Sequence, residues 1–109
     1  MKKLIFLFSL FIAFQAVAQE GIRFRHCSWE EAKAMAKKEK KPIFIDFYTQ
    51  WCGPCLNMAE NIFTLGSVGN FYNDHFVCLK IDAETGEGVE LAKKYEVASF
   101  PTFVFVNPK

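Results

Sequence analysis

The feature that most constrains the fold is a nearly continuous apolar run that leads into a pair of cysteines. The run is Ile43-Phe44-Ile45-Asp46-Phe47-Tyr48, and Cys52 and Cys55 follow it closely. An uninterrupted apolar run of this length is typical of a strand buried on both faces of a sheet. Pro54 is tolerated in the first turn of a helix, and a helical pattern continues to Phe63. The sequence therefore predicts a central strand, then a cysteine pair that opens a helix.

Patterns on either side of this unit predict further helices and strands. Ser28 and Glu31 form a capping box that starts a helix, and Pro42 ends it. Gly66 and Gly69 indicate a loosened chain. The other expected elements are a short strand at 22–25, a strand at 76–82, a helix at 87–95 and a strand at 103–106. Strands that alternate with helices predict an α/β layer structure with right-handed crossovers.

Composition and charge limit the class of protein. The 109 residues suffice for one domain, since single cores usually occupy about 100 to 150 residues. A hydrophobic fraction of 51%, with 13 Phe, predicts a well-filled core rather than disorder. The net charge is only +1, so no nucleic-acid partner is expected. Positive charge is concentrated where it complements a helix dipole, at Lys37, Lys38, Lys40 and Lys41.

The N-terminal residues 1–18 have the pattern of a secretory signal peptide. Met1-Lys2-Lys3 is a basic start, residues 4–14 are apolar, and Ala16-Val17-Ala18 matches a cleavage site. The alternative is a retained membrane anchor, but the apolar run is shorter than the roughly 20 residues that cross a bilayer. We expect residues 19–109 to form the mature domain, without a retained membrane span, in a bacterial periplasm or outside the cell.

The cysteine pair has a spacing that supports thiol–disulfide exchange. The N-terminus of a helix favours an anion, so Cys52 is expected to be the nucleophilic thiolate. Gly53 and Pro54 keep the turn compact, which lets Cys55 attack a mixed disulfide formed on Cys52. Such a dithiol carries its own electrons, so neither a cofactor nor a metal is expected.

Two segments give the chain a family resemblance. The segment Asp46-Phe47-Tyr48-Thr49-Gln50-Trp51-Cys52-Gly53-Pro54-Cys55 resembles the active-site strand and motif of the thioredoxin family, and Phe100-Pro101-Thr102 resembles the cis-proline loop of that family. The resemblance covers roughly residues 20–109 and extends to exported, periplasmic thiol:disulfide interchange proteins. It implies a thioredoxin-like α/β fold with a central mixed sheet flanked by helices.

The resemblance also assigns roles by position. It implies that Cys52 is the attacking thiol, that Cys55 is the resolving thiol, and that the two form the redox disulfide. It places Asp46 as a buried carboxylate beneath Cys55, and Pro101 as a cis-proline facing the pair. Residues implied to bind or position the substrate are Trp51, Gly53, Pro54, Phe100 and Pro101.

Two of these residues have alternative interpretations. Asp46 lies in an apolar strand, where desolvation raises the pKa of a carboxyl and suits it to proton transfer. It could instead only cap nearby backbone N–H groups. Trp51 is either a substrate-facing aromatic residue or a lid on the helix start. A cis bond before Pro101 would turn the backbone of Phe100 toward Cys52, where it could pair with an extended substrate.

The remaining cysteines leave alternatives open. Cys27 and Cys78 are either buried free thiols or a structural disulfide. A zinc site is a further alternative, with Cys52, Cys55, Cys78 and either Cys27 or His26 as ligands.

Two departures from the family pattern bear on function. Cys78 stands where family members often carry a lysine near the buried Asp, which leaves the tuning of Asp46 and Cys55 open. A complete thioredoxin fold continues through one more edge strand and a helix, so we expect this sequence to be a piece of a longer protein. The strand at 103–106 would then be an exposed apolar edge.

These features favour a protein-disulfide reductase that acts on exported proteins. The Gly53-Pro54 dipeptide matches the reducing members of the family. The expected partners are proteins with disulfides and a membrane-embedded thiol electron donor, because a reductase in an oxidising compartment must be recharged. A disulfide isomerase or oxidase, and a binding module without turnover, remain the alternatives.

Overall fold

The computed structural model describes residues 20–109, so the proposed signal peptide at 1–18 lies outside the described residues. The elements are α1 (Trp29–Glu39), β1 (Ile43–Tyr48), α2 (Gly53–Asn61), α3 (Gly66–His75), β2 (Val77–Asp82), α4 (Gly88–Lys94) and β3 (Thr102–Val106). Across this described stretch, none of the helices is both long and apolar enough to span a bilayer.

The sheet is mixed and has β1 at its centre, in the order β2-β1-β3. β1 runs parallel to β2 and antiparallel to β3, and Asp46 lies opposite Lys80 on one side and Phe103 on the other. The side chains from Ile43 to Phe47 are all buried. The predictions of a central strand buried on both faces and of an α/β fold are therefore confirmed.

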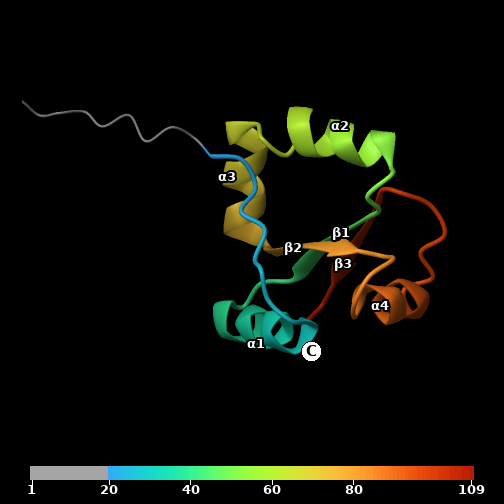
Figure 1. Cartoon of the computed structure of the whole chain (residues 1–109). Helices are drawn as coiled ribbons and strands as arrows, with labels where there is room; N and C mark the ends of the chain where they lie inside the picture. The colour runs from blue at the N-terminus through green and yellow to red at the C-terminus, as the bar shows by residue number, and fades with distance from the viewer. Residues whose placement is uncertain (1–19) are drawn as a thin grey trace, which may run out of the picture.

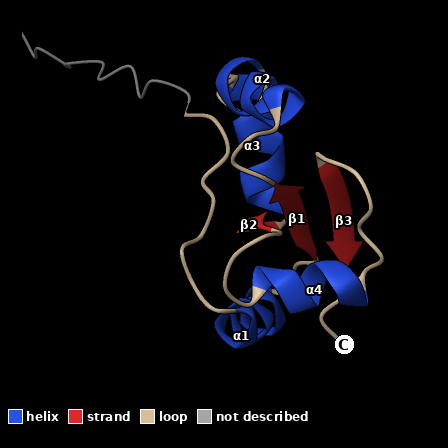
Figure 2. Cartoon of the chain, turned by 45° about the vertical axis from the view of Figure 1, so that its right-hand side comes forward, coloured by secondary structure: helices blue, strands red, loops and turns tan. Residues whose placement is uncertain are grey.

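Helices cover both faces of the sheet, with α1 and α4 on one face and α2 and α3 on the other (Figure 1). Figure 2 shows the same layers with the sheet between them. The α1/α4 face packs around Trp29, Ala32, Ile45, Phe47 and Leu91, among others. The α2/α3 face is aromatic: Phe44 and Phe63 form its core with Cys78, and Phe24, Tyr72 and Phe76 pack against it.

The capping box predicted for α1 is present. The Ser28 hydroxyl accepts a hydrogen bond from the Glu31 N–H at 3.1 Å, and the Glu31 carboxylate accepts one from the Ser28 N–H at 3.3 Å. Lys37 and Lys38 occupy the last turn, where they complement the helix dipole. Lys40 ends the helix in the left-handed region, at φ 56°. The sequence therefore sets both ends of α1.

The loosened chain expected at Gly66 and Gly69 is instead the helix α3. Gly69 is buried where the backbone of residues 20 and 21 crosses the helix, and a Cβ at this position would collide with that backbone. Tyr72 packs its ring against Phe44 at a centroid distance of 4.8 Å. The glycine thus serves close packing between two segments rather than a loop.

The short strand expected at 22–25 is not assigned as a strand. The Arg25 N–H donates to the Cys78 carbonyl at 2.8 Å, but the Ile22 N–H donates to the Phe63 carbonyl, beyond the end of α2. The segment therefore crosses from the α2/α3 layer to the outer side of β2 instead of pairing along it. The alternation of apolar and charged residues reflects burial of Ile22 and Phe24 in the aromatic face.

Candidate active site: the Cys52–Cys55 disulfide

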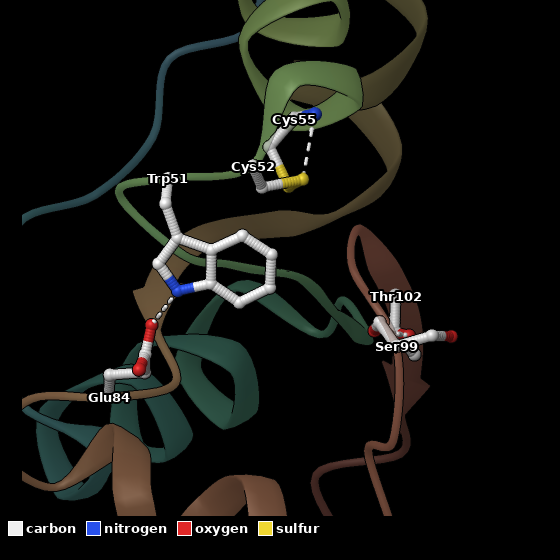
Figure 3. Close-up of a disulfide and its surroundings, with 6 residues drawn as sticks. All are labelled: Trp51, Cys52, Cys55, Glu84, Ser99 and Thr102. Atoms are coloured by element: carbon white, nitrogen blue, oxygen red, sulfur yellow. Dashed lines mark hydrogen bonds between the residues drawn. A yellow bond between two sulfur atoms is a disulfide. The ribbon is translucent and has the colours of Figure 1, made fainter.

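The two cysteines lie at the junction between the central strand and α2. Cys52 is the N-cap of α2, and Cys55 lies in its first turn. They form a disulfide with a Cα–Cα distance of 5.2 Å, and both are almost fully buried (Figure 3). Gly53 and Pro54 between them are exposed. The turn is thus exposed to solvent at Gly53 and Pro54, while the two cysteines beside them are buried.

A backbone hydrogen bond distinguishes the two sulfur atoms. The Cys55 N–H donates to the Cys52 Sγ at 3.1 Å, which is the interaction of a helix N-cap (Figure 3). An N–H at a helix N-terminus carries partial positive charge, so it stabilises an anion on this sulfur after reduction. The geometry therefore favours Cys52 over Cys55 as the thiolate.

Trp51 is 72% exposed beside the disulfide. Its indole N–H donates to the carboxylate of Glu84, in the loop after β2 (Figure 3). Its ring meets the ring of Phe100 edge to face, with centroids 6.1 Å apart. The exposure favours a substrate-facing side chain over a lid on the helix. Sequence reasoning missed Glu84, because the pairing depends on how the loop after β2 folds back toward α2.

The peptide bond between Phe100 and Pro101 is cis, as the resemblance implied. It lies in a turn closed by a hydrogen bond from the Thr102 hydroxyl to the Ser99 carbonyl at 2.6 Å. Figure 3 shows Ser99 and Thr102 on a separate segment of chain near the disulfide. The contact between Phe100 and Trp51 joins this turn to the cysteine loop. The residues implied to bind substrate are therefore brought to one region.

Asp46 is a buried acid in the middle of β1, with 1% of its surface exposed. Burial raises the pKa of its carboxyl to about 6, and the positive charge of Lys80 opposes that rise. Within residues 20–109, its Oδ1 atom is buried without a hydrogen-bond partner. The predicted upward shift of the Asp46 pKa is confirmed. The alternative, that Asp46 only caps backbone N–H groups, has no support at this oxygen.

A hollow of about 330 Å³ opens beside the disulfide. Among the residues that line it are Tyr48, Trp51, Cys52, Cys55, Leu56 and Lys80. The expectation that Cys78 stands in place of the lysine near Asp46 is wrong, because Cys78 lies in register with Phe44, whereas Lys80 lies in register with Asp46. The sequence alone did not single out Lys80, since this pairing depends on the register of β1 and β2.

Cys27 and Cys78 are free thiols on opposite faces of the sheet. They therefore form no structural disulfide. Burial raises the pKa of the Cys78 thiol to about 11, and burial with the nearby Glu31 carboxylate raises that of Cys27. The alternative of a zinc site is not supported, because the described part of the chain has no group of three or more His, Cys, Asp or Glu side chains placed to hold a metal ion.

A disulfide at the start of the helix after the central strand of such a mixed sheet places the chain in the thioredoxin class of folds. A family model described as Thioredoxin-like matches residues 24–108, so the chain belongs to the thioredoxin-like family. The thioredoxin-like fold expected from the resemblance is therefore confirmed.

Known relatives agree with this assignment. A structure from Bacteroides thetaiotaomicron, described as that of a candidate disulphide-isomerase, is 47% identical with a TM-score of 0.73, and the match covers 82% of this chain and 74% of that one. A thioredoxin from Thermus thermophilus is 30% identical with a TM-score of 0.71, over 82% and 67% of the two chains. Thioredoxin-1 of Drosophila melanogaster is 42% identical over 75 residues, which span 69% of this chain and 65% of that relative.

Proposed function

We propose that this chain is a protein thiol:disulfide oxidoreductase, and that it reduces disulfides of exported proteins through Cys52 and Cys55. The observation that carries the proposal is the hydrogen bond from the Cys55 N–H to the Cys52 Sγ, which prepares one sulfur of the pair as the nucleophile. Membership of the thioredoxin-like family supports the reaction class.

The reaction balances in two exchange steps. The Cys52 thiolate attacks a substrate disulfide, forms a mixed disulfide and releases one substrate thiolate. Cys55 then loses its proton to the Asp46 carboxylate and attacks the Cys52 Sγ, which closes the disulfide and releases the second substrate thiolate. The two released thiolates take up protons, so the substrate gains two electrons and the enzyme loses two. Asp46 suits the proton transfer because its pKa, about 6, lies near neutral pH.

The direction and the cellular site belong to the same proposal. The Gly53-Pro54 dipeptide favours a reductase, and the pattern of residues 1–18 favours export to a periplasm or beyond the cell. Because such compartments are oxidising, the dithiol requires a membrane-embedded thiol electron donor to restore it.

An insulin-reduction assay with a small dithiol as donor tests the activity. We expect the wild-type chain to accelerate insulin precipitation and Cys52→Ser to abolish that acceleration. Cys78→Ser is the matched control, because this buried thiol lies away from the hollow and should leave the rate unchanged. Equal rates for the wild type and Cys52→Ser would refute catalysis through this pair.

Isomerase activity is the second candidate. It is supported by the 47% identity to the protein described as a candidate disulphide-isomerase. Refolding of ribonuclease with scrambled disulfides separates the two activities, since an isomerase restores ribonuclease activity without a net gain of thiols. A net gain of substrate thiols without recovery of ribonuclease activity supports the reductase.

A further inference from the structure

Two hollows adjoin each other along α2. The hollow of about 330 Å³ beside the disulfide and a second hollow of about 270 Å³ share two lining residues, Ala59 on α2 and Lys80 on β2. Cys55 lines the first hollow, whereas Phe24 and Phe63 line the second. Together the two hollows make a groove, which begins at the disulfide and ends at the segment that crosses β2. We call it the α2 groove.

The α2 groove and the cis-proline turn lie on opposite sides of the central strand. β1 has β2 on one side and β3 on the other. Lys80 of the groove belongs to β2, whereas Pro101 directly precedes β3. None of the described residues that line the two hollows belongs to the turn at 99–102. A ligand in the groove therefore contacts a surface separate from Phe100 and Pro101.

The α2 groove combines apolar walls with a single charge. Leu56, which is 58% exposed on α2, lines the part beside the disulfide. Ile22, Phe24 and Phe63 line the part at the crossing segment. Lys80 is the only charged side chain among the described residues that line the two hollows. The groove thus offers apolar contacts on both sides of one ammonium group.

The Lys80 ammonium has no carboxylate bound to it. Its Nζ lies 4.9 Å from the centre of the Tyr48 ring and 5.9 Å from that of Phe24, and no ion pair in the described chain includes it. Asp82 projects to the same face of β2, but its carboxylate accepts from the Gln50 side chain at 3.2 Å and from a backbone N–H of the next loop at 2.9 Å. A negatively charged ligand group can therefore pair with Lys80 without displacing another carboxylate.

We propose that the α2 groove is a second substrate-binding surface, which takes an extended segment of the substrate protein with a carboxylate at Lys80 and an apolar side chain against Phe24. Alternate side chains of an extended segment project to the same side, so one such segment can fill both hollows. The inference rests on the proposed function, since it defines the substrate class of the same disulfide: proteins with an acidic and an apolar residue near the cysteine that exchanges with Cys52.

The test is peptide binding to the oxidised full chain, measured by fluorescence anisotropy. The labelled peptides are short, contain leucine, and carry serine in place of the reactive cysteine. One position, moved along the peptide, is Glu, Gln or Lys. We expect the Glu peptide to bind about threefold more tightly than its Gln counterpart at one or more positions. Lys80→Glu should reverse this preference in favour of the Lys peptide, whereas the control Lys93→Glu, on α4, should keep it.

A second variant tests the path of the peptide. Ala59→Gln places a longer side chain where the two hollows meet and should weaken binding of every peptide. Glu60→Gln, exposed at the next position of α2, is the control and should bind as the wild type does. If Ala59→Gln does not fold, the charge reversal at Lys80 still decides the proposal.

The outcomes separate this proposal from the proposed function. Binding to the oxidised chain needs no turnover, so a failed insulin assay with a reversible charge preference would refute the reductase and leave the α2 groove in place. An active enzyme whose affinity is the same for Glu, Gln and Lys at every position would overturn the groove alone. A preference for Glu that persists in Lys80→Glu, or wild-type binding by folded Ala59→Gln, would also overturn it.

Discussion

Asp46 is an ionisable residue whose burial opposes the charged state that the proposed proton transfer requires. Its carboxyl lies in a strand whose other side chains are apolar, and burial raises its pKa from 3.8 to about 6. In the unfolded chain, the carboxyl therefore ionises first as the pH rises. The free energy of unfolding therefore falls as the pH rises from the lower of these two pKa values to the higher one. Above the higher value it falls no further on account of Asp46.

Asp46→Asn should therefore stabilise the oxidised chain at neutral pH. A shift of this size corresponds to a gain of up to about 3 kcal/mol near pH 7, and the gain should vanish below about pH 4. Urea unfolding at several pH values measures it, with Asp74→Asn on the exposed surface of α3 as the control. If Asp46→Asn stabilised the chain equally at both ends of the pH range, ionisation of Asp46 would not be the cause of the lower stability at neutral pH.

Cysteine reactivity provides a second prediction at this scale. In the reduced chain, Cys52 should react with iodoacetamide at pH 7 about tenfold faster than a cysteine in an unstructured peptide, because a helix N-terminus favours the thiolate. Cys78 should react very slowly, since burial raises its pKa to about 11. Peptide mapping by mass spectrometry resolves the sites. A Cys52 rate equal to that of the peptide would remove the basis of the proposed mechanism.

Among the elements, sequence reasoning succeeded where the signal was local. The apolar run of β1 and the capping box of α1 each depend on residues that are close in the chain. It was wrong at α3, where two glycines suggested a loop. The reason for Gly69 lies in residues 20 and 21, which the fold brings against it from far away in sequence.

The α1 cap allows an energetic test at the scale of one element. Ser28→Ala removes the hydroxyl that accepts from the Glu31 N–H, so the chain should lose about 1 kcal/mol of unfolding free energy. Ser67→Ala, at an exposed position in α3, is the control and should change it by less than about 0.5 kcal/mol. Chemical denaturation measures both. Equal effects in the two variants would mean that the cap contributes nothing specific.

At the scale of the whole molecule, the motif predicted the fold and the cysteine pair, whereas the contacts that tune the site required the structure. Glu84 reaches Trp51 through the loop after β2, and Lys80 reaches Asp46 through strand register. Neither pairing leaves a local pattern in the sequence. The family motif thus locates the chemistry, and the tertiary arrangement supplies the charges around it.

The outer strand of the described sheet leads to the last prediction. Phe103 and Phe105 project from β3 toward the aromatic face and remain 40% and 54% exposed. An edge strand that combines unpaired backbone groups with exposed aromatic rings favours association. We expect this chain to associate as its concentration rises, which analytical ultracentrifugation detects.

Phe105→Thr should weaken that association, because threonine keeps the strand propensity while it removes the exposed ring. Leu56→Gln is the matched control: Leu56 is 58% exposed, but it lies on α2 beside the disulfide, where the helix has no unpaired strand edge. If both variants weakened association equally, general surface hydrophobicity would be the cause. A loss confined to Phe105→Thr places the contact on β3, because that variant alone changes the aromatic surface of the edge strand.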